Sequence, residues 1–188
     1  KDLEQLPSMK YVKDVIENKG MLVASEIMMP HIQLPLFEGI APAGKLMPWN
    51  PSVNQLGWPL MQMSRYAKRN GWNIGIKNGK WVGADVIEAE QDNYSGGTPI
   101  ESTWIGLTKY AGDIDGDLIL IQRGVDVPEK GDHRNLPIHN IAKRVKKEAG
   151  NVKLYFDPSH AYGPVLKDNI VDATIEAMKM QYEDTNYV

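Results

Sequence analysis

Asp117-Leu118-Ile119-Leu120-Ile121-Gln122-Arg123-Gly124 is the stretch that decides the fold class of the chain. Its four consecutive apolar residues predict a short strand that is buried on both faces, because a strand with one face in water would alternate polar and apolar residues. Strands of this kind are typical of a parallel sheet that helices cover on both sides. The polar residues from Gln122 onward mark the carboxyl end of the strand.

Further strand and helix signals alternate on both sides of this stretch. The expected strands are residues 21–27, 45–49, 72–77, 117–122 and 152–157. The expected helices are residues 8–19, 60–70, 104–110, 137–149 and 167–180. Ser8 is expected to cap the first helix, and Thr98 with Glu101 to form a capping box before the third. The alternation favours an α/β fold, either a barrel or a doubly wound sheet.

The length of 188 residues suits a single domain that covers residues 1–188, since no internal repeat or linker divides the sequence. The segment from Gly79 to Gly97 is the longest stretch without a helix or strand signal. It is polar and rich in glycine, so it is expected to be a functional or mobile loop.

The composition excludes several classes of function. A formal net charge of -3 gives no general attraction for nucleic acid or for an anionic membrane, so neither is an expected partner. The absence of cysteine rules out disulfides, thiolate zinc sites and cysteine nucleophiles, and it is compatible with a reducing compartment such as the cytoplasm. No apolar run reaches the length of about 18 residues that a membrane span needs.

Polar residues stand at the carboxyl end of every expected strand, which is where α/β folds bind ligands. In chain order these residues are Glu26, Asn50, Lys77, Arg123 and the string from Asp157 to His160. Two cations at equivalent positions in a chain of negative net charge indicate an anionic small substrate. Two other interpretations stay open: both cations could be surface residues paired with acids, and His160 could be a hydrogen-bonded structural histidine.

Four sequence strings carry a family resemblance. They are Gly-Ile-Lys-Asn-Gly at 75–79, Leu-Ile-Gln-Arg-Gly at 120–124, His-Arg-Asn-Leu at 133–136 and Phe-Asp-Pro-Ser-His-Ala-Tyr-Gly at 156–163. In this order they resemble the phosphoenolpyruvate-condensing synthases, which include 3-deoxy-7-phosphoheptulonate synthase and 3-deoxy-octulosonate 8-phosphate synthase. The resemblance covers about residues 21–165, and its most specific string, Asp-Pro-Ser-His-Ala, is most similar to the heptulosonate branch.

The resemblance implies a fold and a reaction. The family fold is a (β/α)8 TIM barrel, of which this chain is expected to hold an incomplete part, about the third to the seventh strand. The implied activity is that of a transferase that forms a carbon-carbon bond. It condenses phosphoenolpyruvate with an aldose or aldose phosphate, releases phosphate, and in the heptulosonate branch serves aromatic amino acid biosynthesis. A homo-oligomer is also expected.

The same resemblance assigns roles to individual residues. Lys77 and Arg123 would hold the carboxylate and phosphate of phosphoenolpyruvate, and His160 would be one ligand of a divalent metal such as Mn, Fe, Zn or Co. Glu26 would lie near the attacking water, so Lys77 and Glu26 are the expected catalytic residues. Asn50 stands where the family commonly has an arginine, which leaves the second substrate open. The expected substrate-binding residues are Lys77, Arg123, Arg134, Asn135, Asn50 and Asp157.

Two other functions fit the same strand ends. Lys77 could instead form a Schiff base with a keto substrate, as in ordinary barrel aldolases, which would require a neutral amine. Alternatively, the chain could be a barrel that binds an anion without turning it over.

Overall fold

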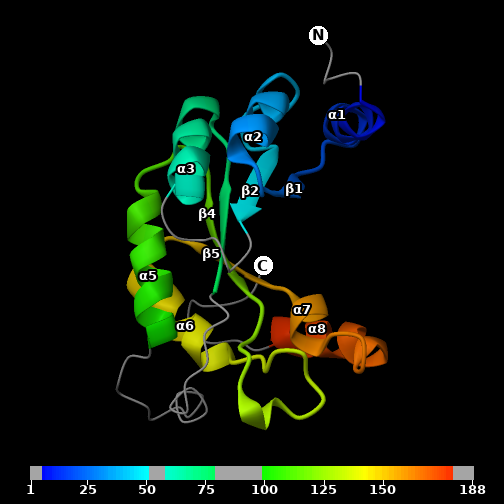
Figure 1. Cartoon of the computed structure of the whole chain (residues 1–188), viewed down its shortest axis with the longest axis vertical. Coiled ribbons are helices and arrows are strands. Elements are labelled where there is room, and N and C mark those ends of the chain that lie inside the picture. Colours follow the sequence, from blue (N-terminus) through cyan, green and yellow to red (C-terminus); the bar gives the residue numbers. More distant parts are fainter. Residues whose placement is uncertain (1–5, 51–57, 79–98, 180–188) are drawn as a thin grey trace. The chain divides into compact units, whose positions relative to one another are not determined.

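The computed structural model describes residues 6–50, 58–78 and 99–179, and it has an α/β fold (Figure 1). The five strands are β1 (Val23–Glu26), β2 (Leu46–Asn50), β3 (Ile74–Lys77), β4 (Leu118–Gln122) and β5 (Lys153–Phe156). The helices are α1 (Pro7–Lys19), α2 (Pro30–Glu38), α3 (Trp58–Asn70), α5 (Pro99–Ala111), α6 (His139–Ala149), α7 (Pro158–Tyr162) and α8 (Ile170–Lys179). Two short 3-10 helices are η3 (Pro128–Lys130) and η4 (Lys167–Asn169).

The strands form a five-stranded sheet in the order β1-β2-β3-β4-β5, and the ladders are parallel. All five predicted strands are therefore confirmed. Five predicted helices are also confirmed, as α1, α3, α5, α6 and α8. The burial of β4 explains its sequence, because every residue from Ile119 to Gln122 is buried, as the continuous apolar run predicts.

Two helices were not predicted, and one predicted cap is wrong. α2 contains Pro35, a residue that normally argues against a helix interior. The start of α2 is instead secured by Gln33, whose side-chain oxygen accepts the backbone N–H groups of Met28 and Met29. Ser8 does not cap α1, because the helix already begins at Pro7.

The described residues divide into two compact units. The first lies within Lys1–Ile76 and Tyr110–Leu118, and the second within Lys77–Lys109 and Ile119–Val188. In the first unit, Trp72 is fully buried and its indole N–H donates to the carbonyl of Ala41 at 2.8 Å. This bond satisfies the one polar atom of a large core side chain.

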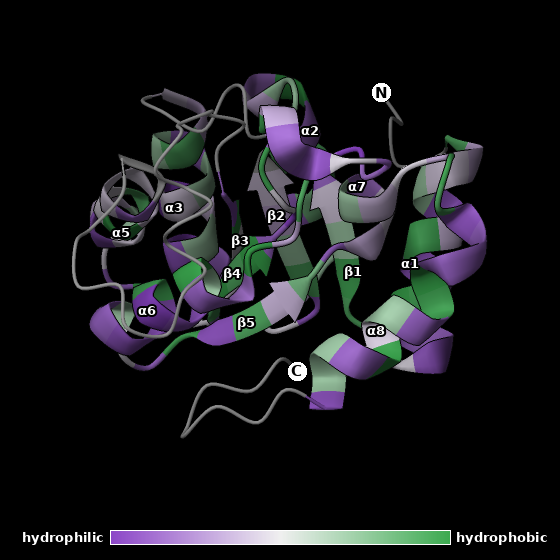
Figure 2. Cartoon of the chain, turned by 90° about the horizontal axis from the view of Figure 1, so that it is seen from below, coloured by the Kyte–Doolittle hydropathy of each residue, from purple (hydrophilic) through white to green (hydrophobic). Residues whose placement is uncertain are grey.

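The second unit contains β5 and most of β4, with helices α6, α7 and α8. Its core takes one face of α6, where Ile141, Ala142 and Val145 are buried. The charged residues of that helix follow a different face, so α6 carries both hydrophilic and hydrophobic residues (Figure 2). In the described part of the chain, no helix has the length and apolar character needed to span a membrane.

Candidate functional site

Lys77, Arg123 and Asp157 lie at the carboxyl ends of three neighbouring parallel strands, β3, β4 and β5. The backbone N–H of Asn78 donates to β4 at 3.1 Å, and that of Asp157 donates to the carbonyl of Gln122 at 2.8 Å. Since side chains alternate between the two faces of a sheet, this register directs Lys77, Arg123 and Asp157 to one face. Three ionisable groups predicted from strand ends are thus brought together within the second unit.

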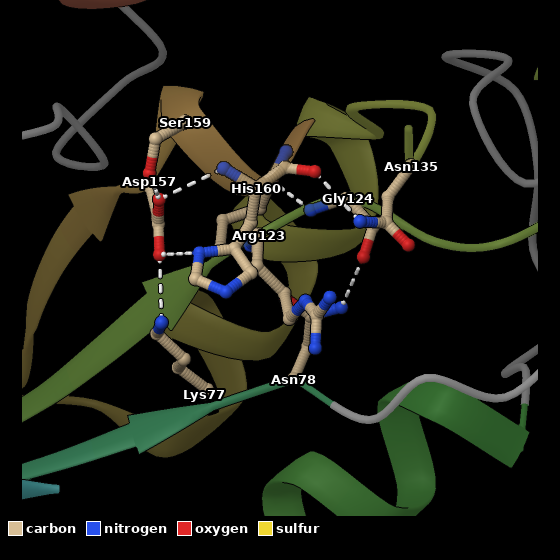
Figure 3. Close-up of polar contacts among 9 residues, drawn as sticks. Lys77, Asn78, Arg123, Gly124, Asn135, Asp157, Ser159 and His160 are labelled. Carbon is tan, nitrogen blue, oxygen red and sulfur yellow. Dashed lines mark hydrogen bonds and ion pairs between the residues drawn. The ribbon is translucent and has the colours of Figure 1, made fainter. Parts of the chain in front are cut away.

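The carboxylate of Asp157 is the centre of this cluster (Figure 3). Its Oδ2 atom lies 2.7 Å from Lys77 Nζ and 2.7 Å from His160 Nδ1. Its Oδ1 atom accepts the Ser159 hydroxyl at 2.8 Å and the backbone N–H of His160 at 3.1 Å. The second of these contacts makes Asp157 the N-cap of α7. One carboxylate therefore fixes both a buried cation and the histidine ring.

The ion pair with Lys77 keeps Asp157 ionised. Burial by itself would raise the pKa of Asp157, but the hydrogen bond and positive charge of Lys77 act against it, with smaller help from Ser159 and His160. The balance lowers the pKa of Asp157 to about 2. Asp157 is therefore a carboxylate, and the Lys77 ammonium has a counter-ion, over the whole physiological pH range.

Lys77 and Arg123 are both buried, with 4% and 6% of their surfaces exposed. Burial lowers the pKa of Arg123, and the charge of Arg134 lowers it further, while Asp157 and Asp126 partly compensate. The largest of these effects is burial, which makes the charged form of Arg123 more costly in the folded chain than in water.

Two buried amides hold the strand end that carries Arg123, and the sequence analysis missed both. The Asn78 side chain accepts the backbone N–H of Arg123 at 2.7 Å and donates to the carbonyl of Gly124 at 2.9 Å. The Gln122 side chain accepts the N–H of Gly124 at 2.7 Å. These bonds fix the peptide from which Arg123 extends. The asparagine of the Lys-Asn-Gly string was a signal that could have indicated this role.

The loop after β4 is tied to the helix that carries His160. Asn135 is buried, and its side-chain N–H donates to the carbonyl of His160 at 2.6 Å. Gly124 makes the close approach of this loop possible, because its φ is +82° and a Cβ atom there would lie 2.6 Å from the carbonyl oxygen of Asn135. Arg134 is exposed and packs over Gly163, where a Cβ atom would lie 2.6 Å from the Arg134 Cβ.

His160 is the one predicted metal ligand. Burial lowers its pKa, Asp157 raises it, and Lys77 and Arg123 lower it, with a net lowering. The ring is therefore neutral near pH 7, and the contact with Asp157 assigns its proton to Nδ1, which leaves the lone pair on Nε2. In the ranges 6–50, 58–78 and 99–179, however, no group of three or more His, Cys, Asp or Glu side chains could hold a metal ion. The described residues supply one ligand and do not form a metal site.

Glu26 and Asn50, the two other predicted residues, belong to the first unit. Glu26 ends β1, as predicted, with an exposed side chain and a carbonyl that accepts the Gln33 side-chain N–H at 3.0 Å. Asn50 ends β2 opposite Ile76, and its side chain lies outside the described structure, as do Thr98 and the predicted loop at 79–97.

No protein-family model matches the chain, and no curated protein matches it. The chemistry of the site follows from its own geometry. The cluster holds two buried cations, a neutral histidine and one carboxylate that already contacts Lys77 and His160, and two cations side by side suit a small molecule with strong negative charge.

Proposed function

We propose that the chain binds phosphoenolpyruvate at Lys77 and Arg123 and condenses it with an aldose or aldose phosphate. The observation that carries the proposal is the pair of buried cations, Lys77 and Arg123, at the ends of adjacent parallel strands. Phosphoenolpyruvate presents a carboxylate and a phosphate a few atoms apart, so it offers one anionic group to each cation. Arginine suits either group, because its planar fork can bind two oxygens at once.

The proposed reaction balances without a redox partner. C3 of phosphoenolpyruvate attacks the aldehyde carbon of the sugar, the carbonyl oxygen takes up a proton, and water adds at C2. The bond between C2 and the phosphate oxygen then breaks and inorganic phosphate leaves. Lys77 and Arg123 act electrostatically, since they hold the charged groups while charge moves through the substrate. No step is assigned to a metal, because the described residues do not form a site for one.

The fold that accompanies this proposal is a part of a (β/α)8 barrel. The sheet order β1-β2-β3-β4-β5 supports it, since the strands lie in the order in which the chain visits them. A barrel has this sequential order, whereas a doubly wound sheet reverses direction at a switch point. A crystal structure of the protein tests the assignment, and a strand order with a reversal would rule it out.

The Schiff-base alternative is disfavoured by one observation. Lys77 Nζ contacts Asp157 Oδ2 at 2.7 Å, whereas imine formation needs an amine that can attack a carbonyl carbon. Reduction with borohydride in the presence of a keto substrate distinguishes the two. The condensation forms no covalent adduct, so a trapped adduct at Lys77 would overturn the proposal in favour of the aldolase.

The deciding experiment measures phosphate release from phosphoenolpyruvate with erythrose 4-phosphate, arabinose 5-phosphate or N-acetylmannosamine, with divalent metal added. We expect release with at least one aldose. Lys77→Met and Arg123→Gln should each reduce kcat/KM on the order of 100-fold, because each removes a buried charge that faces the substrate. Lys147→Met, which removes an exposed lysine of α6, is the matched control and should leave the rate unchanged.

The absence of phosphate release with every aldose would contradict the proposal and exclude the condensation. If phosphoenolpyruvate still bound in that case, the chain would be an anion-binding protein without turnover.

A further inference from the structure

We infer that Asp157 is a positioning residue that fixes the tautomer of His160 and the place of the Lys77 ammonium, and that it makes no contact with the bound anion. This inference differs from the sequence-based expectation that Asp157 binds substrate. The part that concerns the anion rests on the proposed function, whereas the part that concerns His160 does not.

The argument begins with the lone pairs of the carboxylate. An ionised carboxylate has about four acceptor sites on its two oxygens. The protein places four polar atoms against these oxygens: Lys77 Nζ and His160 Nδ1 each lie 2.7 Å from Oδ2, and the Ser159 hydroxyl and the His160 backbone N–H donate to Oδ1. Both oxygens are therefore occupied by the protein, and a substrate anion would in addition be repelled by the negative charge.

The contacts also determine what the two partners can do. Because Oδ2 can only accept, a neutral His160 must carry its proton on Nδ1 and present the lone pair of Nε2. The same oxygen holds the Lys77 ammonium at 2.7 Å, on the side of the carboxylate away from Ser159 (Figure 3). A single oxygen atom thus couples the orientation of the cation to the tautomer of the ring.

Asp157→Asn separates positioning from a purely structural role. Asparagine is as good an N-cap as aspartate, and its carbonyl oxygen can keep the contacts with the His160 N–H and with Ser159. Its NH2 group then replaces Oδ2 and faces two donors, Lys77 Nζ and His160 Nδ1–H. The ring relieves this conflict by moving its proton to Nε2, so that Nδ1 accepts from the new amide.

The first measurement is the ¹⁵N spectrum of the imidazole groups at about pH 8, where a histidine side chain is neutral. The chain has four histidines, and His160→Gln identifies the signals of the one at issue. We expect the wild-type chain to carry the proton on Nδ1 and Asp157→Asn to carry it on Nε2. Asp168→Asn, which neutralises an exposed aspartate of the same unit, is the matched control and should keep the wild-type tautomer.

The second measurement is the affinity for inorganic phosphate, by calorimetry. Because Asp157→Asn removes a negative charge beside two cations and releases Lys77 from its counter-ion, phosphate should bind about 5-fold to 10-fold more tightly. Turnover of phosphoenolpyruvate should fall at the same time, since Lys77 and His160 lose their fixed positions. If Asp157 merely supported the fold, its substitution would weaken phosphate binding and lower turnover together.

Two results overturn the inference. One is a wild-type His160 with its proton on Nε2, a result that requires no variant to fold. The other is an Asp157→Asn chain that binds phosphate more weakly, as Lys77→Met would. If phosphate binds to neither chain, the proposed function fails while the ¹⁵N spectra still decide the role of Asp157.

Discussion

The burial of His139 makes the free energy of unfolding depend on pH. Its ring lies edge-on to Phe156 with centroids 5.3 Å apart, and burial lowers its pKa to about 4. The unfolded chain, whose histidine titrates near its ordinary value, therefore binds more protons than the folded chain between about pH 4 and 6.5. The contribution of the neutral His139 ring to the free energy of unfolding is therefore complete above about pH 6.5 and is lost as the pH falls toward 4.

The expected size follows from the shift. Between about pH 7 and pH 5 the free energy of unfolding should fall by roughly 1 to 2 kcal/mol on account of His139. His139→Gln should remove that part of the slope in urea unfolding curves. His133→Gln, a half-buried histidine of the same unit, is the control and should keep the slope. Equal slopes for the wild type and His139→Gln would show that the ring does not titrate as its burial requires.

Gly124 combines a backbone constraint with a packing constraint, and the two can be separated. Gly124 and Gly150 both have φ of +82°, but a Cβ atom would lie 2.6 Å from Asn135 O at Gly124 and would meet nothing within 4 Å at Gly150. Gly150→Ala should cost about 1 kcal/mol of stability, from the backbone alone. Gly124→Ala should cost about 1 to 3 kcal/mol more, measured by urea unfolding. Equal losses would mean that the loop moves away freely.

The ionisable residues of the site were predicted from the sequence more completely than the residues whose hydrogen bonds fix the backbone around them. Lys77 and Arg123 could be found because a charged residue directly after an apolar strand has a known place at the sheet edge. The bonds of Asn78 and Gln122 were missed: the one from the Arg123 N–H to Asn78 depends on the register between β3 and β4, and the one from the Gly124 N–H to Gln122 depends on the local turn after β4. The contacts of Asp157 with Lys77, Ser159 and His160 could not be predicted, since Lys77 comes close to Asp157 only in the folded chain.

Among the helices, α5 and α6 are joined by two ion pairs that differ mainly in burial. Glu101 accepts from Arg144 Nε at 2.6 Å, with 6% and 26% of the side chains exposed. Glu148 lies 3.5 Å from Lys109 Nζ, with 59% and 70% exposed. Glu101 thus makes a contact between helices, which suits a buried carboxylate because a guanidinium is its strongest partner. Its predicted capping box with Thr98 stays a prediction, since Thr98 lies outside the described residues.

These two pairs predict different losses of stability. Glu101→Gln should lower the free energy of unfolding by about 1 to 3 kcal/mol, because it removes the buried carboxylate charge that Arg144 Nε contacts at 2.6 Å. Glu148→Gln, the matched control, should change it by less than about 0.5 kcal/mol, since water screens the exposed pair. Double-mutant cycles with Arg144→Met and Lys109→Met measure the two coupling energies. Couplings of the same size would contradict the role assigned to burial.

At the level of elements, the sequence predicted strands more completely than helices. β4 is a continuous apolar run, and the other strands were predicted as short segments that alternate with helix signals, although no residue of β1 is fully buried. α2 was missed because of its internal proline and because its start depends on the side chain of Gln33, four residues beyond Met29. α7 was missed because it has only five residues, too few for a helical period to be visible.

For the whole molecule, ligand binding should appear as added stability. A ligand that binds only the folded chain stabilises it by about 2.7 kcal/mol at a concentration of 100 times Kd. For a chain of this size that corresponds to a rise in Tm of roughly 5 to 10 °C. We expect phosphoenolpyruvate to produce this rise in scanning calorimetry and Arg123→Gln to abolish it. Arg65→Gln, on the exposed face of α3, should retain it, and a rise that survives Arg123→Gln would place the anion elsewhere.

The sequential order of the strands also has a consequence for how the chain folds. Each ladder joins strands that are neighbours along the chain, as in the pairing of Val23 with Leu46 and of Ile119 with Lys153. Within the described sheet each strand pairs with the strand next to it along the chain. The entropic cost of loop closure is therefore divided over several strand additions and does not fall on one long loop. Folding can therefore proceed by addition of one strand and helix at a time, and the anion site forms only when β5 joins β4.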